Sequence, residues 1–415
     1  MASLDGADIK EGKVGANALA EGTGVSGLVV AAPAAAQLAH SVVEEIYNRV
    51  DANLLGINAA FDTENNVNLY RHIDEFYRIR GEGEKLYLLL APQATSMADI
   101  LDDVDVEFAK LLLNTAKGEV RQLAIAVNPT DATVMLNNMP DDVFASIPKA
   151  QGLYNWADER FKPAQIILEC YDFGTDSAAA ANLRAIENVK APNVSLVNGQ
   201  DWKYADSLVG NAQKFGDVGT ALGTLSAAAI NQNIGDNEAF NLTDSTKDAW
   251  LIPGLSSHKK NTEVAESLQT LENKGYIFGF EYVGMDGVRW NNDHTCVEII
   301  VDDDGNINGH TIAYNRTHDE ARRRLRTALL PKVKTKQPVN PKTGLLPIGV
   351  VKHFENLGDA VLDDMERRKE ITEGKTIVDP KSDLLVEKLL KVKFQIIPYG
   401  NVNAINGTSN LKTSL

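Results

Sequence analysis

Short apolar runs alternate with amphipathic stretches through the first half of the chain. The runs at 28–32, 85–90, 122–127, 165–169 and 194–197 are predicted strands. Apolar residues at helical spacing predict helices over 37–55, 69–81, 102–117, 142–160 and 177–188. Continuous apolar strands are typical of a sheet buried on both faces. Residues 23–249 are therefore predicted to form an α/β domain with a doubly wound, mainly parallel sheet.

One stretch between the two halves has an unusual composition. Residues 216–230 (GDVGTALGTLSAAAI) are mostly small. Since glycine and alanine leave the backbone uncovered, this segment is expected to lie close against another element.

The pattern changes after residue 250. A helix is predicted over 262–273, strands over 276–283, 295–301 and 310–314, and a last strand over 391–397. The helix predicted at 317–330 begins with Thr317 and Glu320, which form a T-x-x-E capping box, and ends at Pro331. A further helix is predicted at 357–369. These elements indicate an α+β domain over 250–400.

The two ends of the chain have no apolar periodicity of their own. Residues 1–22 and 401–415 are predicted to be extended arms, because so little apolar surface cannot offset the entropy of ordering them. Such segments can instead add a strand to the sheet of a neighbouring molecule. The candidate arm-strand residues are Val14, Leu19, Val392, Phe394, Ile396, Val402 and Ile405.

Charge is distributed unevenly over the 415 residues. The formal net charge is −16, which argues against a nucleic-acid binder because it repels a phosphate backbone. Residues 311–352, however, hold ten Lys or Arg against two Asp or Glu. We expect the arginines of the predicted helix 317–330 to share one exposed face. The candidate interface residues of this basic region are Arg316, Arg322, Arg323, Arg324, Arg326, Lys332 and Lys334.

No motif for catalysis, a cofactor or a metal ion stands out. The G-x-G-x-x-G run at 22–27 precedes a strand where a dinucleotide site needs a helix. The run at 304–309 copies half of a calcium loop but has Asn315 at the twelfth position, so a hairpin turn is the better interpretation. The two cysteines, Cys170 and Cys296, are too few for a disulfide framework. Neither a signal peptide nor a membrane span is expected.

Several segments resemble contractile tail sheath proteins. The segment 68–90 (NLYRHIDEFYRIRGEGEKLYLLL) is similar to their helix, glycine turn and buried strand, and 315–330 (NRTHDEARRRLRTALL) to the arginine-containing helix of their C-terminal domain. Segments 354–374 and 389–405 resemble the final helix and β ending of that domain. Segments 216–225 and 275–292 also fit divergent sheath-like proteins.

The resemblance implies a structural subunit without enzymatic activity or a cofactor. Such subunits form six-fold rings that stack helically around an inner tail tube and contract to drive the tube through a target cell envelope. The implied partners are other copies of the chain, joined through their arms, together with the tube, baseplate and tail terminator proteins. The implied location is the tail of a virion or of a phage-tail-like particle, assembled in the bacterial cytoplasm.

Two alternatives stay open at this point. Residues 27–200 alone also fit a doubly wound α/β enzyme with a ligand at the carboxyl ends of its strands. Another oligomeric virion component, such as a tube or baseplate protein, is the second alternative.

Overall fold

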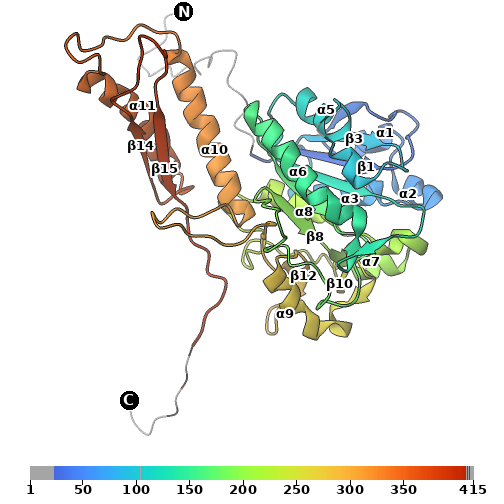
Figure 1. The fold of residues 1–415 in the computed structure, drawn as a ribbon. Helices are drawn as coiled ribbons and strands as arrows, with labels where there is room; N and C mark the ends of the chain where they lie inside the picture. Colours follow the sequence, from blue (N-terminus) through green and yellow to red (C-terminus); the bar gives the residue numbers. More distant parts are fainter. Residues whose placement is uncertain (1–22, 103, 408, 410, 412–415) are drawn as a thin grey trace, which may run out of the picture.

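A six-stranded, mainly parallel sheet forms the centre of the larger part of the molecule (Figure 1). The computed structural model describes residues 23–102, 104–407, 409 and 411. The strand order is β2-β3-β1-β4-β7-β8, and only β2 runs antiparallel to its neighbour. The predicted mixed α/β fold with a mainly parallel sheet is thus confirmed. The strands are β1 (Ser26–Ala31), β2 (Val43–Ile46), β3 (Leu86–Ala91), β4 (Gln122–Val127), β7 (Gln165–Glu169) and β8 (Val194–Val197).

Apolar side chains fill a separate core on each face of this sheet. Along β1, Val29 and Ala31 belong to one core, whereas Leu28 and Val30 belong to the other. Helices α5 (Phe108–Thr115) and α6 (Asp141–Glu159) contribute to the first core, and α3 (Leu69–Arg80) and α8 (Val218–Ala227) to the second. The shorter helices of this part are α1 (Arg49–Leu54), α2 (Ala59–Asn65), α4 (Met97–Ile100) and α7 (Trp202–Asp206).

Helices α3 and α8 are in contact through two glycines. A Cβ atom added to Gly223 would lie 2.8 Å from the carbonyl oxygen of Phe76, and one added to Gly219 would overlap the backbone of His72. The expectation that the small residues of 216–230 lie against another element is therefore confirmed.

Residues 250–312 complete these same cores. The indole rings of Trp250 and Trp290 are 5.2 Å apart in the second core, and Tyr276 lies in the first. The side chains of this segment thus share the two cores of the central sheet. The segment contains β10 (Pro253–Leu255), β11 (Lys259–Lys260), α9 (Ala265–Lys274), β12 (Gly279–Glu281) and β13 (Val288–Trp290); β10 pairs with β9 (Gly199–Asp201). The two-residue strands β5 (Met135–Leu136) and β6 (Met139–Pro140) form a hairpin.

A smaller unit with its own apolar clusters follows. It consists of α10 (Ile312–Leu329), α11 (Ile348–Arg367) and the antiparallel hairpin of β14 (Glu373–Val378) and β15 (Val392–Ile397). Figure 1 shows this unit beside the larger one, with α10 between the hairpin and the larger unit and the C-terminal tail running away from both. Ala321, Leu325, Leu362 and Met365 form part of its core.

Two helices predicted for the larger unit are wrong. Residues 37–55 form β2 and α1 instead, because Val43–Ile46 pairs with β3 as the edge strand of the sheet and Asn48 caps a new helix. Residues 177–188 form turns, in which the Asp176 and Asn182 side chains accept hydrogen bonds from the nearby backbone N–H groups of Ala178 and Arg184. Such local bonds compete with a helix.

The start of the arginine-rich helix was also predicted wrongly. There is no strand at 310–314. Helix α10 begins at Ile312, and the Thr311 hydroxyl accepts a hydrogen bond from the N–H of Tyr314 at 3.1 Å. Thr317 lies inside the helix and donates to the carbonyl oxygen of Ala313. The predicted end at Pro331 is close to the observed one, at Leu329.

Candidate assembly interface

The arginines of α10 join the two units of the chain. Arg316 is only 5% exposed, and its guanidinium lies 3.4 Å from the carbonyl oxygen of Ala228. Arg323 donates to the carbonyl oxygens of Gly118, at 2.9 Å, and Pro163. Both of these acceptors belong to the larger unit, so this side of α10 faces protein and not solvent.

The neighbouring arginines are held in ion pairs. Arg322 lies 2.7 Å from Asp158 at the end of α6, and Arg324 pairs with Glu320 and Glu370. The prediction of one exposed arginine face is therefore wrong for Arg322, Arg323 and Arg324. The charges are matched inside the chain, because α10 is covered by the larger unit on one side and by α11 on another.

Three of the predicted basic interface residues stay accessible. Arg326 is exposed and stacks over the Phe161 ring at 3.5 Å from its centroid. Lys334 is exposed and Lys332 is half-buried. A contact of these three with another molecule stays a prediction.

Burial shifts the pKa of two charged groups at the junction. Burial raises the pKa of Asp319 to about 6, although the hydroxyl of Tyr154 donates a hydrogen bond to it at 2.8 Å. Burial also lowers the pKa of Arg323 to about 10. In the contact between α6 and α10, each buried polar group thus depends on its partner.

The hairpin of the smaller unit has two different edges. The N–H groups of Thr376 and Val378 in β14 donate to the carboxylates of Asp359, at 2.7 Å, and Glu355, at 3.3 Å, from α11. Side chains of α11 thus cover the outer edge of β14. The sequence did not predict this role for the two carboxylates, because both occupy ordinary polar positions of an amphipathic helix.

Among the described residues, no strand pairs with the outer edge of β15, which is therefore the open edge of the hairpin. The N–H of Asp379 donates a hydrogen bond to the carbonyl oxygen of Lys391, so these two opposite residues are a hydrogen-bonded pair. Hydrogen-bonded and non-hydrogen-bonded pairs alternate from there along the hairpin. By the alternation of antiparallel pairing, the N–H and carbonyl groups of Val392, Phe394 and Ile396 point away from β14. An unpaired edge of this kind is a template for another strand.

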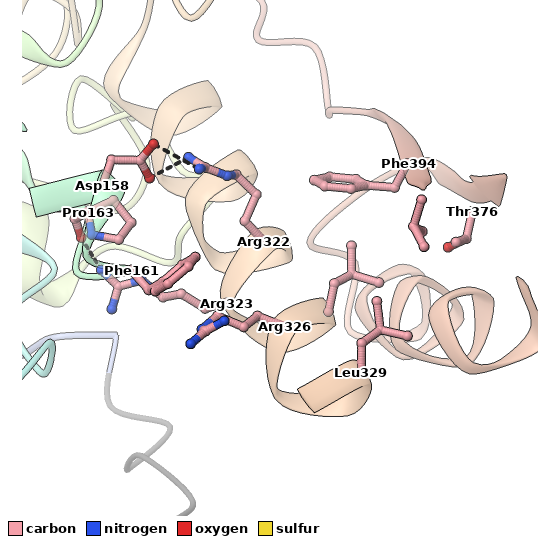
Figure 2. A pocket seen from close by; sticks show the side chains of 11 residues that line it. Asp158, Phe161, Pro163, Arg322, Arg323, Arg326, Leu329, Thr376 and Phe394 are labelled. Carbon is pink, nitrogen blue, oxygen red and sulfur yellow. Dashed lines mark hydrogen bonds and ion pairs between the residues drawn. The ribbon is translucent and has the colours of Figure 1, made fainter. Parts of the chain in front are cut away.

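A groove with a volume of about 300 Å³ lies beside this edge (Figure 2). Figure 2 shows Phe161, Arg322 and Arg326 on one side of it and Phe394 and Thr376 on the other. Its lining is mostly apolar, with the paired arginines of α10 as its polar part. The lining residues are Asp158, Phe161, Pro163, Arg322, Arg323, Leu325, Arg326, Leu329, Thr376, Val392 and Phe394.

The predicted arm-strand residues fall into three groups. Val392, Phe394 and Ile396 lie in β15, paired with β14 and packed on the clusters of their own unit, so they are not part of a free arm. Val402 and Ile405 are 79% and 89% exposed in a tail without secondary structure. Val14 and Leu19 lie outside the described residues.

The described residues include no group of three or more His, Cys, Asp or Glu side chains that could hold a metal ion. Cys170 and Cys296 are buried free thiols. The predicted turn at 304–309 is confirmed, with Val301 bridged to Ile307. None of the described helices is long and apolar enough to cross a membrane.

The chain has the fold of contractile sheath proteins. It is 14% identical to a protein in the contracted helical sheath of the anti-feeding prophage, with a TM-score of 0.58 and 99% of each chain covered. A chain of the anti-feeding prophage baseplate in its contracted state matches at 11% identity and a TM-score of 0.61, with both chains fully covered. The sheath tail protein of Desulfitobacterium hafniense matches at 11% identity and a TM-score of 0.50, with 95% of this chain and 100% of that one covered.

A search of curated proteins finds no match. Residues 11–294 match the N-terminal domain of a protein family designated DUF2586, which is more than half of the chain. The chain therefore belongs to the DUF2586 family.

Proposed function

We propose that this protein is a structural subunit of a contractile tail sheath, without enzymatic activity. The open edge of β15 carries the proposal, because it has a groove beside it and leads directly into a tail that leaves the body of the molecule. A donor strand and an acceptor edge on one chain allow each copy to pair with the next, which generates an open assembly. The fold shared with sheath proteins supports the same conclusion.

In this proposal the subunits form hexameric rings that stack helically around an inner tail tube. The terminal segments 1–22 and 401–415 act as arms that add strands to neighbouring copies at β15. The sheath contracts without nucleotide hydrolysis and drives the tube through a target envelope. Its further partners are the tube, baseplate and tail terminator proteins, in a particle assembled in the bacterial cytoplasm.

We propose a domain division that follows the cores. Residues 23–311 form the doubly wound α/β domain, and 312–400 form the domain that receives the arms. The family match ends at residue 294, which supports a domain boundary between residue 294 and the start of α10.

The similarity to chains of the anti-feeding prophage baseplate favours a second candidate. A subunit with a sheath fold can also occupy the end of a sheath where it meets the baseplate. Self-assembly distinguishes the two roles, because a sheath subunit forms long tubes whereas a baseplate component stops at a single ring.

Truncation tests the function. The full chain, a chain without residues 401–415, and a chain whose residues 401–415 are replaced by a Gly/Ser segment of equal length are compared by electron microscopy and circular dichroism. We expect long tubes from the full chain only, with the same fold in all three. Normal tubes from the truncated chain would contradict the proposed arm exchange.

A further inference from the structure

An exposed acidic hairpin lies just before the start of α10. Residues 298–308, here called the acidic hairpin, are closed by the Val301–Ile307 bridge and by a hydrogen bond of 3.0 Å from the N–H of Asp302 to the carbonyl oxygen of Asn306. Its apolar side chains are exposed, with Val301 at 62% and Ile299 at 55%. The exposed acidic residues are Glu298, Asp302, Asp303 and Asp304. An ordered hairpin that exposes both apolar and acidic side chains is a feature of a binding surface.

A groove of matching character lies near the end of α10. This lysine groove, of about 640 Å³, is lined by the apolar residues Leu329, Phe354, Leu390 and Val392 and by the lysines 332, 334, 336 and 388. Within the part of the chain that the structure describes, none of these lysines has a carboxylate within 4.0 Å. No carboxylate of the described residues thus competes with a partner for these charges.

The two surfaces lie at opposite ends of one helix. The hairpin precedes the first turn of α10, and the groove begins at Leu329, its last residue. Eighteen helical residues span about 27 Å, which separates the start of the helix from the lysines that follow its end. A hydrogen bond from the Asn306 side chain lowers the pKa of Asp302, and the charge of Lys393 on β15 acts in the same direction.

We propose that the acidic hairpin of one copy docks into the lysine groove of the next copy. The apolar side chains of the hairpin cover the apolar floor of the groove, and its carboxylates meet the lysines at the rim. Apolar contact at the centre with charges at the edge is the usual anatomy of a protein interface. Because the two surfaces differ, the contact joins copies head to tail and does not close on itself. It deepens the proposed sheath function and rests on it.

The alternative occupant is the N-terminal segment of a chain, residues 1–22. That segment has four Asp or Glu and two Lys, spread over its length. The hairpin places four carboxylates within seven residues, 298–304, next to exposed apolar side chains. The density of complementary charge favours the hairpin.

A charge swap tests the contact with the full-length protein. One variant carries Glu298→Lys, Asp303→Lys and Asp304→Lys, and leaves Asp302, which supports the turn, unchanged. The other carries Lys332→Glu, Lys334→Glu and Lys336→Glu. A matched control changes three exposed glutamates on other elements, with Glu64→Lys, Glu187→Lys and Glu266→Lys. Association is measured by sedimentation velocity, and the form of the assemblies by electron microscopy.

We expect each swapped variant alone to associate at least about tenfold more weakly than the control, because like charges then face each other. Mixing the two variants should restore association, since each hairpin then meets a groove of opposite charge. Normal assembly of both variants would overturn the contact. Loss in the groove variant alone, without rescue by mixing, would also overturn it and assign the groove to residues 1–22. Rescued association without tubes would instead keep the contact and contradict the sheath function.

Discussion

The guanidinium of Arg322 on α10 lies 2.7 Å from the carboxylate of Asp158 at the end of α6. Together with Arg323, this pair holds the smaller unit of the chain against the larger one. In the proposed sheath, a link at this point would transmit a force on the smaller unit to the α/β domain without passing through a loop. It also fixes the width of the groove beside β15, because Arg322 and Arg323 both line it.

Arg323 is expected to contribute to stability and not only to assembly. The change Arg323→Met keeps an extended apolar stem but leaves the carbonyl oxygens of Gly118 and Pro163 without their donor. We expect it to lower the free energy of unfolding by about 2–4 kcal/mol. Arg326→Met is the control, because Arg326 is exposed and only stacks on Phe161. Urea denaturation measures both; equal stabilities for the two variants would refute the buried role of Arg323.

The helix contact at Gly219 gives a second prediction. Gly219→Ala places a methyl group against the backbone of His72, so α3 and α8 must move apart. We expect a loss of about 1–3 kcal/mol or more in the free energy of unfolding. In Gly349→Ala, on α11, the added atom meets nothing within 4 Å, and the better helix former should be neutral or stabilising. Thermal denaturation compares the two variants, and a tolerated Gly219→Ala would mean that the packing of α3 on α8 is looser than described.

The sequence predicts the central strands well because each strand is identified by the apolar residues within its own few positions. Strands 122–127, 165–169 and 194–197 have the predicted bounds, since a short apolar run has few alternatives to a buried strand. Residues 37–55 were predicted wrongly because pairing with β3 decides their conformation, and that partner is distant in sequence. The arginines of α10 show the same limit. Their number predicts a charged face, but only the fold reveals the carboxylates and carbonyl groups that neutralise it.

Stability should depend on pH through a buried carboxyl group. Glu169 accepts hydrogen bonds from the N–H groups of Val127 and Gly216, yet burial raises its pKa to about 8. The folded state therefore keeps a proton that the unfolded state loses near the ordinary pKa of Glu, about 4.3. Unfolding releases that proton, so this group's contribution to stability falls as the pH rises from about 4.5 to 8. Asp62 and Asp293, whose pKa burial raises to about 7, act with the same sign.

The change Glu169→Gln isolates this effect. The variant should lose about 1–3 kcal/mol at pH 6, because an amide group offers one acceptor atom where the carboxyl offers two. The fall in melting temperature between pH 6 and pH 8 should be smaller than in the unchanged protein, since no proton is released from this position. An unchanged pH dependence would show that Glu169 is already ionised in the folded protein.

The open edge of β15 can be tested at a single backbone atom. The N–H of Ile396 points away from β14, so proline at this position removes no bond of the hairpin. The residue before it, Gln395, is extended, as the residue before a proline prefers. Ile396→Ala is the matched control, because it removes the side chain and keeps the N–H. Both variants should fold, with similar losses of stability from the missing apolar contacts.

Assembly should separate the two variants. If a strand from a neighbouring copy pairs with β15, proline removes one hydrogen bond of that ladder in every subunit, and its ring obstructs the approach of the incoming strand. We expect Ile396→Pro to form far fewer tubes than Ile396→Ala at equal protein concentration, as counted by electron microscopy. Equal assembly by the two would mean that no strand is added at this edge, and the groove beside it would then have to receive side chains alone.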